Sequence, residues 1–183
     1  MTAWRCLLVL AVAISIALSL TAPAASDARV VFSLTTQHGA AFTDRNIDGA
    51  PVAIFFGFTH CPDVCPTTLL QMTQDLEELG SDGDKIKVLF VSVDPERDTP
   101  ARLKVYMASF DPRIVALTGA EDVIAAVARA YGASYRKVPS GDSYTIDHTA
   151  AVLLLDREGE YVGALTHADS RSARLEKLRR LLP

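Results

Sequence analysis

The residues of this chain best suited to chemistry are two cysteines four positions apart, Cys61 and Cys65. They lie in the loop THCPDVCP, between an apolar segment and a helix predicted to begin at Pro66. Ligands of open α/β sheets bind at such junctions, beyond the carboxyl ends of the strands. The helix N-terminus favours thiolate over thiol there. Because thiolate is both the nucleophile and the metal ligand, the pair suits metal binding or disulfide chemistry.

The spacing of the cysteines favours a metal. Thioredoxin-like oxidoreductases separate their cysteines by two residues, whereas Pro62, Asp63 and Val64 intervene here. The wider separation suits two sulfurs that reach one ion. Soft sulfur selects Cu(I) or zinc, and imidazole suits copper in both oxidation states. Two cysteines and a histidine therefore make a good copper site, whereas zinc normally takes a fourth ligand.

The elements that must position these residues predict an α/β fold with a mixed central sheet flanked by helices. Apolar runs predict strands at 51–58, 85–93, 114–117, 150–155 and 161–165. Periodic apolar positions and capping residues predict helices at 66–79, 99–110 and 120–131, and a last helix capped by Ser170. The turn signal PSGD predicts a hairpin within 135–146. This order of elements fits a thioredoxin-like fold.

Four histidines are available as a third ligand. His148 precedes the predicted strand 150–155, and in a thioredoxin-like fold the residue before that strand faces the cysteine loop. We therefore predict that Cys61, Cys65 and His148 bind one copper ion. Asp147 is either an acceptor that orients the imidazole or a simple turn residue.

The other histidines and the methionines are predicted to lie outside the site. His60 adjoins Cys61, but a neighbouring side chain often points elsewhere. His38 and His167 lie in polar segments that predict surface positions. Met72 and Met107 fall on the apolar stripes of predicted helices, which indicates core positions rather than copper-binding thioethers.

Residues 1–25 are predicted to be a signal peptide or an N-terminal membrane anchor. Arg5 is followed by twenty uncharged residues, in which Ala22 and Ala24 fit an A-x-A cleavage site. Twenty residues are also about the length that spans a bilayer, so cleavage and retention both stay open. Residues 26–183 are expected to form a single domain of an exported protein.

Composition excludes several other classes of protein. Of the 183 residues, 49% are hydrophobic, which argues against disorder. The net charge of −4, with no basic stripe, argues against nucleic-acid binding. Paired cysteines of an exported protein form a structural disulfide by default. A loop this short, however, constrains the unfolded chain little, and a domain of this size does not need the bond.

Four sequence blocks resemble the Sco/SenC family of copper-binding assembly factors for cytochrome c oxidase. They are FFGFTHCPDVCPTTL at 55–69, FVSVDPERDTP at 90–100, DPR and LTG within 111–119, and DHTAA at 147–151. The resemblance implies a thioredoxin fold with copper held at positions 61, 65 and 148. It also implies a periplasmic protein, free or anchored to the inner membrane, that helps build the copper A centre of oxidase subunit II and receives copper from an upstream donor protein.

Three functions compete on the residues themselves. The first is a metallochaperone, which transfers copper by ligand exchange and is not an enzyme. The second is a thiol–disulfide oxidoreductase that keeps the copper-ligand cysteines of a partner reduced. The third is a peroxidase, since Thr59 precedes Cys61 by two residues, but the upstream proline expected there is missing. Copper binding needs His148, whereas the thiol reactions do not. The segment VDPERDTP at 93–100 is either a docking surface or a capped helix start.

Overall fold

The computed structural model describes residues 31–182, so the predicted leader at 1–25 lies outside the described residues. Within 31–182, no helix combines the length and the apolar character needed to cross a membrane. The export of the chain and the fate of its leader stay predictions.

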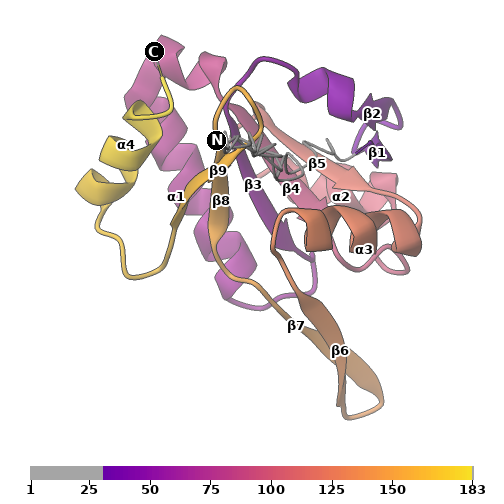
Figure 1. Ribbon diagram of the computed structural model, residues 1–183. Coiled ribbons are helices and arrows are strands. Elements are labelled where there is room, and N and C mark those ends of the chain that lie inside the picture. The colour runs from indigo at the N-terminus through magenta and orange to yellow at the C-terminus, as the bar shows by residue number, and fades with distance from the viewer. Residues whose placement is uncertain (1–30, 183) are drawn as a thin grey trace, which may run out of the picture.

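A seven-stranded mixed sheet forms the centre of the molecule (Figure 1), as the pattern of apolar runs predicts. The strand order is β2-β1-β5-β4-β3-β8-β9. The strands are β1 Ser33–Thr36, β2 Ala41–Thr43, β3 Val52–Gly57, β4 Lys87–Ser92, β5 Ile114–Thr118, β8 Val152–Leu155 and β9 Tyr161–Leu165. Strands β3, β4 and β5 are parallel, and β8 pairs antiparallel with β3.

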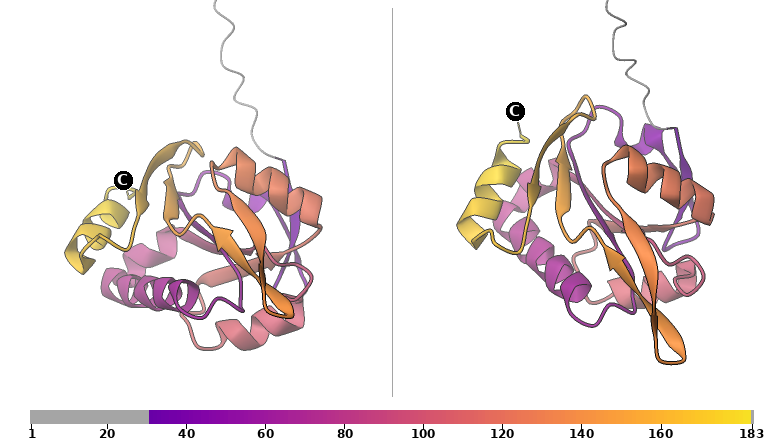
Figure 2. Two further views of the ribbon diagram at one scale, coloured as in Figure 1. Left: turned by 90° about the horizontal axis from the view of Figure 1, so that it is seen from below. Right: turned by 60° about the horizontal axis from the view of Figure 1, so that its bottom comes forward.

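Four α-helices cover the sheet: α1 Val64–Leu79, α2 Pro100–Met107, α3 Glu121–Ala130 and α4 Arg171–Arg179. Two short 3-10 helices, η1 Asp44–Ile47 and η2 Gly80–Lys85, connect strands and helices. Helices α1 and α2 lie on one face of the sheet, as right-handed crossovers between the parallel strands β3, β4 and β5 require, and α3 lies on the other face (Figure 2). Helix α4 packs against α1 and β9.

Local sequence signals explain most helix boundaries. The Thr99 hydroxyl accepts a hydrogen bond from the Arg102 N–H at 3.3 Å, and the Ser170 hydroxyl accepts one from the Ala173 N–H at 3.2 Å, as their capping roles predict. The predicted start of the first helix at Pro66 is wrong by two residues, because α1 begins at Val64. A proline fits the third helical position, since the first N–H groups of a helix have no partner within it.

The near-continuous apolar runs at 51–58 and 85–93 form the central strands β3 and β4, and both are buried. Every residue of β3 is buried, and so is every residue of β4 except its first. The largest fully buried side chains include Phe56, Phe58 and Phe90. The segment before residue 50 carries β1, β2 and η1, for which the sequence analysis predicts no elements.

The predicted hairpin is a two-stranded sheet separate from the central one, made of β6 Tyr135–Ser140 and β7 Ser143–His148. It projects beyond the layers of the molecule (Figure 1), and each of its strands packs mainly against the other. Ile146 is the one residue of these two strands that is fully buried. The hairpin is therefore attached to the domain by few apolar contacts.

Candidate metal centre

The two cysteines lie where β3 passes into α1, as the sequence predicts. The loop turns tightly after the strand, because the Cys61 N–H donates to the Phe58 carbonyl oxygen at 3.3 Å. Cys65 lies in the first turn of α1 and is fully buried, whereas Cys61 is partly exposed. The Cys65 N–H donates to the Cys61 sulfur at 3.4 Å. The helix start thus holds one sulfur at the surface and the other beneath it.

Gly57, the last residue of β3, allows Cys65 to approach the sheet. A Cβ at this position would lie 2.8 Å from the Cys65 Sγ and 2.8 Å from the ring of Phe90. Neither neighbour can move freely, since both are buried. Gly57 stands in the block FFGFTHC, but nothing in the sequence pattern distinguishes it; only the packing of β3 against α1 shows what it does.

His148 is the last residue of β7, and its ring reaches the cysteines. The imidazole Nε2 lies 3.5 Å from the Cys65 Sγ. The ring packs edge-on against Phe55 and Phe58, with centroids 5.9 and 5.8 Å apart. Its Nδ1 lies 3.1 Å from the Thr149 carbonyl oxygen, which can only accept a hydrogen bond. The proton therefore belongs on Nδ1, and the Nε2 lone pair faces the sulfur.

The structure brings together the three residues predicted as ligands. The ligand atoms of Cys61, Cys65 and His148 all lie within 4.8 Å of one another. Two sulfurs and one imidazole nitrogen form a soft donor set that suits Cu(I) and leaves one side open. The residues present thus fit a copper ion in the way that the sequence analysis expects.

The protonation of Cys65 differs from the expectation. Burial is the largest influence on this thiol and raises its pKa far above the ordinary value of 9.0. A hydrogen bond to the backbone of Phe58 lowers the pKa, but by less, and the neighbouring Cys61 raises it further. The prediction that the helix N-terminus favours thiolate is therefore wrong for Cys65 in the metal-free protein, and a bound cation must displace its proton.

Asp147 does not orient the imidazole. Its carboxylate pairs with Arg136 at 2.7 Å on the exposed face of the hairpin. The acceptor for the His148 ring is the carbonyl oxygen of Thr149. Of the two roles that the sequence leaves open for Asp147, the one beside the metal site is wrong.

His60 points away from the sulfurs, toward a second group of polar residues. Its Nδ1 lies 3.3 Å from the Thr59 hydroxyl and 4.0 Å from the Asp98 carboxylate. His60, Asp94 and Asp98 lie close enough together to suggest a metal site. Both carboxylates already accept hydrogen bonds from protein donors, among them Thr59, Ser92 and Tyr144. This group is therefore better described as a hydrogen-bond network.

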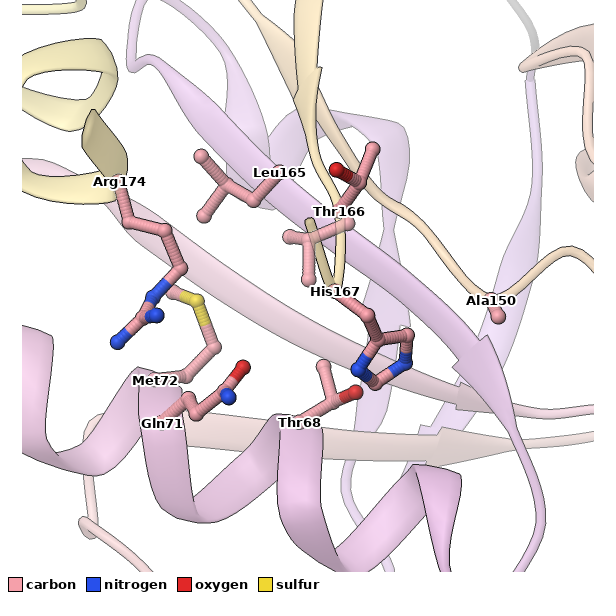
Figure 3. Close-up of a pocket in the computed structure, with 9 residues that line it drawn as sticks. Thr68, Gln71, Met72, Ala150, Leu165, Thr166, His167 and Arg174 are labelled. Atoms are coloured by element: carbon pink, nitrogen blue, oxygen red, sulfur yellow. The ribbon is translucent and has the colours of Figure 1, made fainter. Parts of the chain in front are cut away.

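The remaining predicted positions lie outside the site. His38 is exposed in a turn. Figure 3 shows His167 on the loop after β9, over Thr68 of α1 and beside a small pocket that Met72 and Arg174 also line. Met72 and Met107 are buried in the core, as predicted.

Tyr106 of α2 is a further residue near the sulfurs that the sequence analysis does not single out. Its ring packs against Phe90 and Phe110. Within residues 31–182, the buried hydroxyl has no hydrogen-bond partner. Burial is the main cause that raises its pKa, and charges on Cys65 and Cys61 raise it further. The raised pKa keeps this hydroxyl neutral at ordinary pH.

Several known proteins are similar to this chain in sequence. The SCO1/SenC family model matches residues 21–183. "Protein SCO2, mitochondrial" of Saccharomyces cerevisiae is 40% identical over 152 residues, which are 81% of this chain and 50% of that protein. "Protein SCO1 homolog, mitochondrial" of Homo sapiens is 42% identical over 135 residues, which are 72% of this chain and 45% of that protein. The chain spans about half the length of these relatives.

A solved structure is also similar. The structure of Bradyrhizobium japonicum ScoI with copper bound superimposes with a TM-score of 0.77 and is 46% identical in sequence. The match covers 83% of this chain and 98% of that one. The thioredoxin-like arrangement predicted from the order of elements is thus the fold of a copper-bound relative.

Proposed function

This chain belongs to the SCO1/SenC family, and on that premise we propose that it is a copper metallochaperone that delivers copper to, or prepares, the copper A centre of cytochrome c oxidase subunit II. Sco proteins are a family of cytochrome c oxidase assembly proteins. The proposal includes an upstream protein that donates the copper. The ion is cargo, so the chain turns nothing over.

One observation carries the proposal: His148 is 83 residues from Cys65 in the sequence, yet its ligand atom and those of Cys61 and Cys65 all lie within 4.8 Å of one another. We propose these three residues as the ligands of one copper ion. The partial exposure of Cys61 and the burial of Cys65 support transfer by ligand exchange. A ligand of the partner reaches the ion from the solvent side, where Cys61 lies. The buried Cys65 keeps its bond to the ion until the exchange is complete.

The freedom of both thiols supports a second candidate function, thiol–disulfide exchange. In this reaction the exposed Cys61 attacks a disulfide of the partner and releases one partner thiol. Cys65 then attacks the mixed disulfide. The products are a Cys61–Cys65 disulfide and two reduced partner cysteines, so electrons and protons balance. This reaction has no need of His148.

Anaerobic titration of the reduced protein with Cu(I), against a competing chelator, tests the metallochaperone function. We expect one equivalent to bind to the wild type. We expect His148→Ala to weaken binding by more than about tenfold, and Cys61→Ala with Cys65→Ala to abolish it. His60→Ala is the matched control, because this histidine adjoins the site but points away from the sulfurs. Binding that ignores His148 would contradict the proposed ligand set and favour thiol exchange.

We also propose that the domain works outside the cytoplasm, in the periplasm, either free or anchored to the inner membrane through residues 1–25. The leader pattern and the family relationship support this location. N-terminal sequencing of the protein recovered from periplasmic and membrane fractions decides between cleavage and retention. Recovery of the intact chain from the cytoplasm would rule export out.

A further inference from the structure

The loop formed by residues 94–98, between β4 and α2, contacts both halves of the proposed copper site. On the cysteine side, the fully buried Asp98 accepts hydrogen bonds from the Thr59 N–H at 2.9 Å and the Thr59 hydroxyl at 2.6 Å. A third bond at 2.6 Å comes from the Ser92 hydroxyl at the end of β4. Through these hydrogen bonds, Asp98 connects Thr59, at the start of the cysteine loop, to Ser92 at the end of β4.

On the other side, the same loop holds the hairpin that ends in His148. The Tyr144 hydroxyl of β7 lies 2.7 Å from the Asp94 carboxylate and 3.1 Å from that of Glu96. Lys137 of β6 pairs with Glu96 at 2.8 Å. Burial is the main cause that raises the pKa of Tyr144, and its hydrogen bond to Asp94 raises it further, so the hydroxyl stays a donor at neutral pH. Both strands of the hairpin are thus attached to the loop.

Arg97 makes the closest attachment. Its Nε donates to the buried Asp94 carboxylate, and its Nη1 donates to the Tyr144 carbonyl oxygen at 3.1 Å. The guanidinium also lies 3.8 Å from the centroid of the Tyr144 ring. The same group is 5.9 Å from the ring of Phe58, which packs edge-on against His148. Arg97 thus links the hairpin to Phe58, the ring that packs edge-on against His148.

The hairpin depends on these contacts because its own packing is weak. A two-stranded hairpin is marginally stable by itself, and Ile146 is the one fully buried residue of β6 and β7. Since His148 ends β7, any tilt of the hairpin moves the imidazole relative to the sulfurs. The Arg97–Asp94 pair is well shielded, with side chains 20% and 0% exposed, so solvent screens it less than a surface pair.

We propose that Arg97 and Tyr144 are positioning residues for His148: by fixing the hairpin to loop 94–98, they set the distance from the imidazole Nε2 to Cys61 and Cys65 and thereby the affinity for copper. The inference rests on the proposed function. It gives the VDPERDTP segment a role that differs from a docking surface, and it predicts that loss of these contacts acts on copper only through His148.

A double-mutant cycle with Cu(I) and a competing chelator tests the inference. Tyr144→Phe removes the hydroxyl and keeps the ring, while Arg97→Gln removes the ion pair and the stacking. We expect each to weaken Cu(I) binding about tenfold in the wild-type background and to have no further effect in the His148→Ala background. Tyr161→Phe and Arg157→Gln are matched controls at exposed positions of β9 and of the turn before it, and should change nothing.

The outcomes separate the two proposals. Equal weakening with and without His148, or no weakening in the wild-type background, overturns the positioning role. Binding that ignores His148 itself overturns the ligand set, and the positioning role with it. Thermal unfolding of each variant checks that the domain is folded, and Tyr144→Phe, which removes a single oxygen atom, keeps the test decisive if Arg97→Gln fails to fold.

Discussion

Cys61 and Cys65 follow a strand in the middle of the central sheet, whereas His148 ends a hairpin that is separate from that sheet. The cysteines lie between a fully buried strand and the first turn of α1, where Gly57 leaves no room for one additional methyl group. His148 ends a hairpin with a single fully buried residue, held by the polar contacts of loop 94–98. Close packing therefore fixes the sulfurs, and a few polar contacts fix the imidazole.

This difference suits a site that must hold an ion and then release it. A packed core has few alternative arrangements, so the sulfurs stay where they are when the ligand set changes. Hydrogen bonds and ion pairs that are partly exposed open at a lower cost in free energy. In the proposed copper transfer, the histidine half is therefore the part of the site that moves away, and the cysteine half is expected to be the rigid one.

The largest effect is expected from the ion pair that fixes α1 to α4. Arg174 donates to both carboxylate oxygens of Asp75, at 2.7 and 3.1 Å, and the two side chains are 8% and 0% exposed. Asp75→Ala leaves the arginine buried without its partner, so we expect the free energy of unfolding to fall by about 3–5 kcal/mol. Denaturant unfolding measures it.

The exposed pair Arg180–Glu176 on α4 is the control for this prediction. Glu176→Ala should lower the free energy of unfolding by less than about 1 kcal/mol. If Asp75→Ala costs no more than this control, the helix that carries Cys65 is not held by a buried ion pair, and the contrast between the two halves is weaker than we infer.

An intermediate effect is expected at Gly57. The added methyl group of Gly57→Ala forces Cys65 and the Phe90 ring apart, which should cost about 1–3 kcal/mol of stability. The control adds a methyl group to the exposed hairpin residue Ser143, and Ser143→Thr should change stability by less than about 0.5 kcal/mol. Similar losses of stability in Gly57→Ala and Ser143→Thr would show that the cysteine loop and the hairpin are packed equally closely.

The smallest effect is a dependence of apoprotein stability on alkaline pH. The thiol of Cys65 ionises near its ordinary value of 9.0 in the unfolded chain, but burial raises the folded-state pKa. Above pH 9 the unfolded state therefore binds fewer protons than the folded state. Stability should therefore fall as the pH rises, by about 1 kcal/mol between pH 9 and pH 10 from this group.

Cys65→Ala provides the comparison that isolates the group, because every other alkaline titration is shared with the wild type. The difference in unfolding free energy between the two proteins should be constant below pH 9, where it reflects only the lost packing of the buried side chain, and should change above pH 9 as the wild type alone loses stability through this thiol. Cys61→Ala, which leaves Cys65 buried, should keep the slope of the wild type. An identical slope for the wild type and Cys65→Ala would mean that Cys65 is not protonated in the folded protein.

Much of the fold follows from local patterns. The central strands are near-continuous apolar runs, and the caps of α2 and α4 are Thr99 and Ser170, so short segments specify them without help from the rest of the chain. Strands β1 and β2 escape prediction because they are only four and three residues long, and their sequences, SLTT and AFT, contain no run of alternating apolar residues. The start of α1 is misplaced because a proline is tolerated throughout the first turn of a helix, not only at its first position.

The three proposed ligands could be predicted from the sequence, and the structure brings them together. Two cysteines at a strand-to-helix junction and a histidine before a later strand are residue types at readable positions, and residue type decides which metals a site prefers. Four features of the site appear only in the tertiary structure. They are the proton on Cys65, the Thr149 carbonyl oxygen that faces the His148 ring, the space at Gly57 and the contacts of loop 94–98. The loop contacts join segments as much as 50 residues apart, the proton on Cys65 and the space at Gly57 depend on burial, and even the adjacent Thr149 carbonyl meets the imidazole only through the folded backbone. A linear pattern carries neither the burial of an atom nor its distance from another segment, and both quantities exist only once the chain has folded.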